Sequence, residues 1–136
     1  MRVVVSVGGS VLVPNLSPER VAAYARAIES LDDGGHTVGT VVGGGTTARE
    51  YIEPARELGA NEIELDDIGI AVTRLNARLL IAALDDRAAP EPPRTYAAGR
   101  EAIRRGDVPI MGGTVAGQTN DAVSAAFAED ADADLL

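Results

Sequence analysis

The sequence contains no cysteine and no lysine, so that all 12 of its basic residues are arginine. The absence of cysteine excludes disulfides and thiolate chemistry. The absence of lysine excludes Schiff-base catalysis, and it excludes a Walker-type phosphate loop, which needs its GK[ST] ending. The single histidine, His36, lies in the turn DDGGH (residues 32–36). We expect it to be a turn residue, since one histidine cannot build a zinc site.

Long apolar runs are also missing, and none approaches the roughly 18 residues of a membrane span. The first ten residues lack a signal-peptide layout, because their apolar stretch ends in glycines after a few residues. The 21 acidic residues give a net charge of −9, which repels phosphate backbones and anionic lipid. We therefore expect a cytoplasmic protein with no nucleic-acid or membrane partner.

The acidic, lysine-free composition is typical of a salt-loving organism, because carboxylates retain water and cations at high salt. A GC-rich genome, which also favours Arg, Asp and Ala, is the alternative. In both cases the acidic run EDADAD (residues 129–134) is interpreted as a solvated surface and not as a site.

The chain is long enough for one domain with a substantial core. β-rich runs predict strands at 2–7, 37–42 and 108–111, and a further strand that opens at 134–136. Helical spacing and caps predict helices at about 18–31, 47–58, 67–84, 98–105 and 121–131. Pro54 predicts a break or kink in the second helix. The alternation predicts a parallel α/β sheet with helices on both faces.

The longest expected helix, 67–84, has two faces. The face expected to pack on the core carries Ile68, Val72, Leu75 and Leu79. The opposite face carries Thr73, Arg74 and Arg78. Further apolar residues on other sides indicate either burial in the core or a subunit contact. Asp66 precedes the helix and is expected to cap it or to accept hydrogen bonds from sugar hydroxyls.

Three of the expected strands end in the same way, as VSVGGS (5–10), VVGGGT (41–46) and IMGGT (110–114). Glycine allows a close approach of the backbone to a ligand, and the free N–H groups at a helix start attract anions. Because parallel strands share their carboxyl edge, the three turns should meet in one site for several phosphate groups. The alternative is that they are only tight turns.

Other candidate residues surround this edge. Arg49 lies one turn beyond Gly45, from where its guanidinium can reach a phosphate. The polar loop TVAGQTND (114–121) suits a binding loop or a helix cap. Gly43, Gly45 and Ala48 also fit a dinucleotide fingerprint, but its acidic residue should close a strand, whereas Asp66 precedes a helix.

Four motifs carry a family resemblance. They are VGGSV (7–11), VVGGG with an arginine (41–49), D-x-I-G with T-R-x-N-A (66–77), and MGGT…TNDAV (111–123). In order and spacing they resemble the archaeal-type UMP kinases of the amino-acid kinase family. The resemblance implies a three-layer α/β/α sandwich around a mainly parallel sheet. Together with the acidic composition, it implies that the organism is a halophilic archaeon. It also implies a homohexamer that uses ATP and Mg²⁺ to convert UMP to UDP in pyrimidine nucleotide biosynthesis.

The resemblance also assigns roles to individual residues. Those of the ATP phosphate region are Gly9, Ser10, Gly45 and Arg49. Those that contact UMP are Gly44, Asp66, Thr114, Val115, Ala116, Gly117, Gln118, Thr119 and Asn120. Asp121 and Arg49 are the expected catalytic residues, with Asp121 near the reacting phosphates. No metal ligand is assigned.

The sequence departs from the family pattern at three points. Many relatives carry a lysine where this chain has Ser6, and Pro54 interrupts a helix that is usually unbroken. The chain ends at Leu136, where the family continues, so we expect a single domain (1–136) that is the monophosphate-binding part without the ATP-binding part. Two alternatives stay open: a family member with another acceptor, and a non-catalytic nucleotide-binding or oligomer-forming module.

Overall fold

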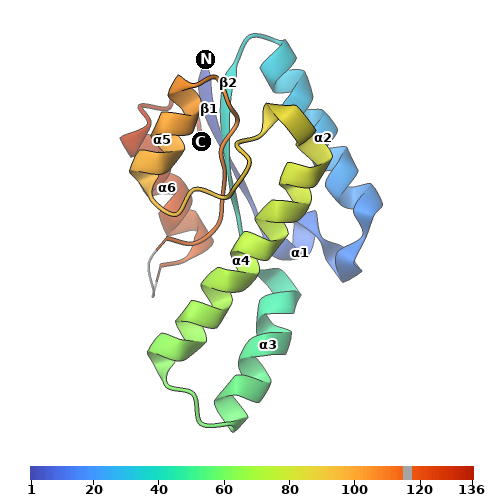
Figure 1. Ribbon diagram of the computed structural model, residues 1–136, viewed down its shortest axis with the longest axis vertical. Coiled ribbons are helices and arrows are strands. Elements are labelled where there is room, and N and C mark those ends of the chain that lie inside the picture. Colours follow the sequence, from blue (N-terminus) through green and yellow to red (C-terminus); the bar gives the residue numbers. More distant parts are fainter. Residues whose placement is uncertain (115–117) are drawn as a thin grey trace.

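The computed structural model describes residues 1–114 and 118–136 (Figure 1). Its strands are β1 (Arg2–Val7), β2 (Thr37–Val42) and β3 (Ile110–Met111). Its helices are α1 (Gly9–Leu12), α2 (Pro18–Asp33), α3 (Gly45–Glu57), α4 (Glu62–Leu84), α5 (Tyr96–Arg104) and α6 (Asn120–Asp130). Two short 3₁₀ helices cover Pro14–Leu16 and Asp85–Arg87.

The three strands form one parallel sheet in the order β1-β2-β3, as the alternation of strands and helices predicts. Leu135 adds a parallel bridge to Val3, in agreement with the strand opening expected at 134–136. β3 is shorter than expected, because Pro109 has no N–H to donate to a ladder. The carbonyl of Pro109 still accepts from the N–H of Thr40 at 2.9 Å.

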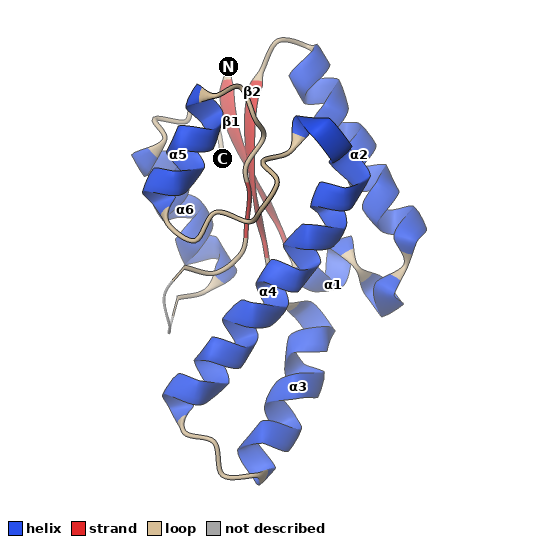
Figure 2. Cartoon of the chain, in the orientation of Figure 1, coloured by secondary structure: helices blue, strands red, loops and turns tan. Residues whose placement is uncertain are grey.

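Helices cover both faces of the sheet (Figure 2). Side chains alternate between the faces of a strand. Val42 and Ile110 pack in one core with α2 and α4. Val41 and Met111 point to the other face and pack with α5 and α6 around Phe127. The expected three-layer α/β/α architecture is therefore confirmed.

α3 and the first half of α4 form a helical hairpin that projects beyond the carboxyl edge of the sheet (Figure 1). α3 has no buried residue and runs without interruption through Pro54 to Glu57. The expected break at Pro54 is therefore wrong. The proline leaves the carbonyl of Glu50 without its helical donor, but both residues are exposed, so water can take that place.

α4 begins earlier than expected and turns a different face to the core. Asn61 caps it in a capping box with Glu64, so Asp66 lies inside the helix and is not its cap. Leu75 and Leu79 are 58% and 41% exposed, which contradicts their expected place in the core. The buried residues are Leu65, Val72, Asn76, Ala77, Leu80 and Leu84. The polar Asn76 lies in the middle of this buried face, so apolar periodicity alone does not identify the face.

Candidate active site at the carboxyl edge of the sheet

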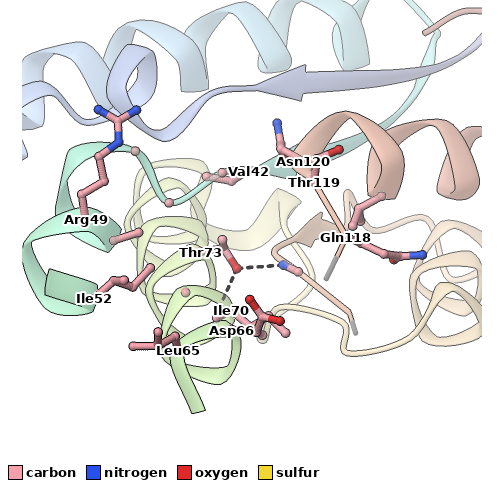
Figure 3. Close-up of a pocket in the computed structure, with 17 residues that line it drawn as sticks. Val42, Arg49, Ile52, Leu65, Asp66, Ile70, Thr73, Gln118, Thr119 and Asn120 are labelled. Carbon is pink, nitrogen blue, oxygen red and sulfur yellow. Dashed lines mark hydrogen bonds between the residues drawn. The ribbon is translucent and has the colours of Figure 1, made fainter. Parts of the chain in front are cut away.

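A cavity of about 610 Å³ lies where the strands end (Figure 3). Its walls come from the turn after β2, from α3 and α4, and from the start of α6. The residues that line it are Val42, Gly43, Gly44, Gly45, Ala48, Arg49, Ile52, Leu65, Asp66, Gly69, Ile70, Thr73, Gly113, Gln118, Thr119, Asn120 and Val123. The cavity therefore combines apolar walls with a few polar groups, as small-molecule sites do.

The turns after β1 and β2 pack backbone against backbone. A Cβ on Gly9 would lie 2.5 Å from the carbonyl oxygen of Gly43. A Cβ on Gly45 would lie 2.6 Å from the carbonyl carbon of Gly9, and Gly45 also has φ +62°. These glycines are therefore required by the contact between the two turns, in addition to any approach to a ligand.

The turn after β2 leads directly into α3 with free donors. Among the described residues, no acceptor takes the N–H groups of Gly44, Gly45, Thr46 or Thr47. The first N–H groups of a helix have no partner within the helix, and they favour anions. Arg49 stands in the same first part of α3, is exposed, and forms no ion pair with any described residue.

The turn after β3 is held by α4 and differs from the other two. Gly113 donates its N–H to Thr73 Oγ1 at 2.7 Å, and Arg74 Nη2 donates to the Gly113 carbonyl at 3.0 Å. A Cβ on Gly112 would lie 2.5 Å from Thr73 Oγ1. The N–H of Gly113 is therefore not available to a ligand in the cavity, although this turn has the same diglycine sequence as the turns after β1 and β2.

Arg74 is a residue that the sequence places on the wrong side of α4. It lies partly buried under the β3 turn, and its Nε is buried without a partner among the described residues. Burial and, secondarily, the charge of Arg94 lower the pKa of Arg74. Thr73, Arg74 and Asn76 received no role from the sequence, although they stand in the T-R-x-N-A motif. The available signal was that three of the four residues 73–76 are polar in an otherwise largely apolar helix.

The residues expected to bind ligands fall into several groups. Gly44, Gly45, Arg49, Asp66, Gln118, Thr119 and Asn120 line the cavity. Gly9 and Ser10 lie behind it, against Gly45. Thr114 Oγ1 donates to Tyr96 or Gln118, at 3.3 and 3.2 Å. Val115, Ala116 and Gly117 lie outside the described residues.

Asp121 lines a second cavity, of about 660 Å³, on the far side of β1 from β2. Ser6 and Ser124 share this cavity, with their hydroxyl oxygens 2.9 Å apart. Asn120 Nδ2 also donates to Ser6 Oγ at 3.1 Å. Asn120 therefore lines the first cavity and donates to a residue of the second, whereas Asp121 lines only the second one.

The described residues include no group of three or more His, Cys, Asp or Glu side chains that could hold a metal ion. Within the same residues, no helix combines the length and the apolar character that crossing a membrane requires.

Comparison with known proteins agrees with this geometry. The model of the Amino acid kinase family matches residues 1–136. The chain belongs to the amino acid kinase family. A uridylate kinase of Haloarcula marismortui is 73% identical over 136 residues, which are all of this chain and 60% of that protein. A uridylate kinase of Halobacterium salinarum is 68% identical over the same residues, which are 56% of its length.

Solved structures of amino acid kinases share the fold. Uridylate kinase from Archaeoglobus fulgidus superposes with a TM-score of 0.92 at 48% identity, over 98% of this chain and 60% of that one. Aspartate kinase from Synechocystis superposes with a TM-score of 0.81 at 20% identity. The resemblance given by the four motifs is therefore confirmed. The chain spans between 56% and 60% of the length of the two curated relatives described above.

Proposed function

We propose that this chain binds UMP in the cavity between α3, α4 and the start of α6. It would be the monophosphate-binding part of a UMP kinase that transfers the γ-phosphoryl group of ATP to UMP and forms UDP for pyrimidine nucleotide biosynthesis. The observation that carries the proposal is the 73% identity to a uridylate kinase over 136 residues, a match that includes every residue lining the cavity. The protein would act in the cytoplasm.

The lining of the cavity suits a nucleoside monophosphate. Asp66 supplies a carboxylate for ribose hydroxyls, and Gly44 lies at the turn whose N–H groups suit a phosphate. Gln118, Thr119 and Asn120, with residues 114–117, would surround the rest of UMP. Gly9, Ser10, Gly45 and Arg49 would contact the phosphates of ATP.

Phosphoryl transfer needs in-line alignment and charge neutralisation more than a covalent helper. Arg49 and the N–H groups at the start of α3 provide positive potential in a chain that lacks lysine. The cavity lining offers one carboxylate, that of Asp66. Such a lining fits Mg²⁺ that arrives with the nucleotide, because this ion keeps several waters and is held largely by substrate phosphates. When bound, Mg²⁺ would neutralise phosphate charge. The family resemblance assigns Asp121, which lines the neighbouring second cavity, to ordering the groups around the phosphates.

Calorimetric titration with UMP at molar KCl tests the binding proposal on this chain. We expect UMP to bind more tightly than AMP or an acyl phosphate, and failure to bind UMP would contradict the proposal. A coupled assay for UDP from UMP and ATP then tests catalysis. UMP binding without UDP formation would favour the non-catalytic module, whereas preference for another acceptor would favour a different member of the family.

Replacing Asp121 by asparagine is expected to leave the UMP affinity of this chain within about twofold of the original, because the substitution keeps the size of a side chain that does not line the UMP cavity. Asp121 lines the second cavity and not the one proposed for UMP. Titration of UMP into Asp121→Asn and into the original chain gives the comparison. A large loss of affinity would show that UMP reaches across Asn120 to Asp121.

The exposed apolar side of α4 is proposed as a subunit contact of a homo-oligomer, a hexamer by family resemblance. We expect light scattering at molar KCl to report a mass above that of one chain, and Leu75→Glu to reduce it to the monomer. Leu75 is 58% exposed at mid-helix, so a charge there opposes association without entering the core. Leu58→Glu, at the 89% exposed tip of the hairpin, is the matched control. A monodisperse monomer before substitution would contradict the contact.

A further inference from the structure

Asn76 is a polar residue in the middle of the core-facing side of α4. It is 3% exposed, and asparagine is a weak helix former. A buried amide is costly unless its hydrogen bonds are satisfied. Its Nδ2 donates to the carbonyl of Gly43 at 3.0 Å and to that of Gly44 at 3.2 Å. Asn76 therefore connects α4 to the turn that opens α3.

These two hydrogen bonds also help to fix the directions of two N–H groups. The Gly44 carbonyl accepts a second hydrogen bond, from the N–H of Ala48 in α3 at 3.3 Å, whereas the Gly43 carbonyl is held by Asn76. A trans peptide unit is planar, and its C=O and N–H point in opposite directions. The described residues contain no cis peptide bond. When Asn76 holds the carbonyls of Gly43 and Gly44 on the side of α4, the N–H groups of Gly44 and Gly45 must point away from α4.

The N–H groups of Gly44 and Gly45 are available to an anion. Both residues line the cavity proposed for the nucleotide. No described residue accepts a hydrogen bond from either of them. A carbonyl oxygen turned the same way would present negative potential to a phosphate and repel it.

We propose that Asn76 is a positioning residue, which aims the N–H groups of Gly44 and Gly45 at a phosphate group of the bound nucleotide. The proposal deepens the proposed function and rests on it for the identity of the nucleotide. Thr73 and Arg74 hold the neighbouring turn at Gly113 in a similar way. One helix thereby sets the orientation of two of the three glycine turns.

Comparison of UMP with uridine isolates the contribution of the phosphate. We expect Asn76→Ala to weaken UMP binding by about tenfold, the loss of one charge-assisted hydrogen bond, and to leave the affinity for uridine unchanged. A purely structural role would weaken both ligands alike, and that result would overturn the proposal. Thr40→Val is the matched control, since Thr40 is buried in β2 and its hydroxyl has no partner among the described residues. It should change neither affinity.

Asn76→Leu gives a second variant of similar volume, in case Asn76→Ala does not fold. Its side chain cannot donate to the glycine carbonyls, so we expect at least the same loss for UMP. Retention of the full UMP affinity in a folded Asn76→Leu would overturn the proposal.

An amide NMR titration with inorganic pyrophosphate separates this inference from the identity of the nucleotide. The resonances of Gly44 and Gly45 should shift in the original chain and shift less in the Asn76 variants at the same concentration. If UMP does not bind but pyrophosphate gives this pattern, the proposed function fails and the role of Asn76 stands. If the two resonances do not respond in the original chain, the role of Asn76 is overturned.

Discussion

Gly45→Ala is expected to abolish UMP binding and to lower the free energy of unfolding by roughly 3–5 kcal/mol, the sum of backbone strain and overpacking. Gly45 has φ +62°, which an L side chain rarely adopts. Its added Cβ would also collide with the backbone of Gly9 and Ser10. Relief of that collision would separate the two turns and displace the N–H groups at the start of α3. Chemical denaturation and calorimetry at molar KCl measure the two effects.

Gly35→Ala is the matched control for this substitution. Gly35 also has a positive φ, +87°, but a Cβ there would meet nothing within 4 Å. We therefore expect a loss of only about 1 kcal/mol from backbone strain, with UMP binding retained. If Gly45→Ala cost no more than Gly35→Ala, the close contact between the turns after β1 and β2 would be contradicted.

Asp66→Ala is expected to weaken UMP binding by roughly tenfold to a hundredfold, the range for a hydrogen bond to a charged group. The Asp66 side chain lines the cavity from α4 (Figure 3), where it can accept from two ribose hydroxyls. The fold should survive, because Asp66 lies inside α4 and alanine is a better helix former. Calorimetry with UMP measures the change.

Asp67→Ala provides the control, since Asp67 is the exposed neighbour of Asp66 and does not line the cavity. It removes the same charge from the same helix, so it corrects for the general electrostatic effect on an anionic ligand. We expect it to leave UMP affinity unchanged or slightly improved. If Asp66→Ala instead improved UMP binding, Asp66 would lie beside the phosphate and not beside the ribose.

The sequence was sufficient for the features that depend on neighbouring residues. Runs such as Arg2–Val7 and Thr37–Val42 are short, rich in valine and followed by glycines, so their strands and their shared edge could be predicted. The helix after Ser17 could be predicted in the same way from its first-turn proline. The parallel three-layer order follows from the alternation of these elements. The family motifs identified Gly44, Gly45, Arg49 and Asp66, which the structure brings together in one cavity.

The tertiary structure alone decided how the site is built from these parts. Asn76 joins residues 33 positions away, and Thr73 joins a glycine 40 positions away. Such contacts depend on how α4 crosses the end of the sheet, and no local periodicity encodes that crossing. Periodicity therefore placed Arg74 on the face opposite the core and Leu75 in the core, whereas Arg74 is partly buried under the β3 turn and Leu75 is exposed. The separate cavity of Asp121 became visible only once α6 was placed on the sheet, because Asn120 and Val123 then line the first cavity while Asp121 and Ser124 line the second.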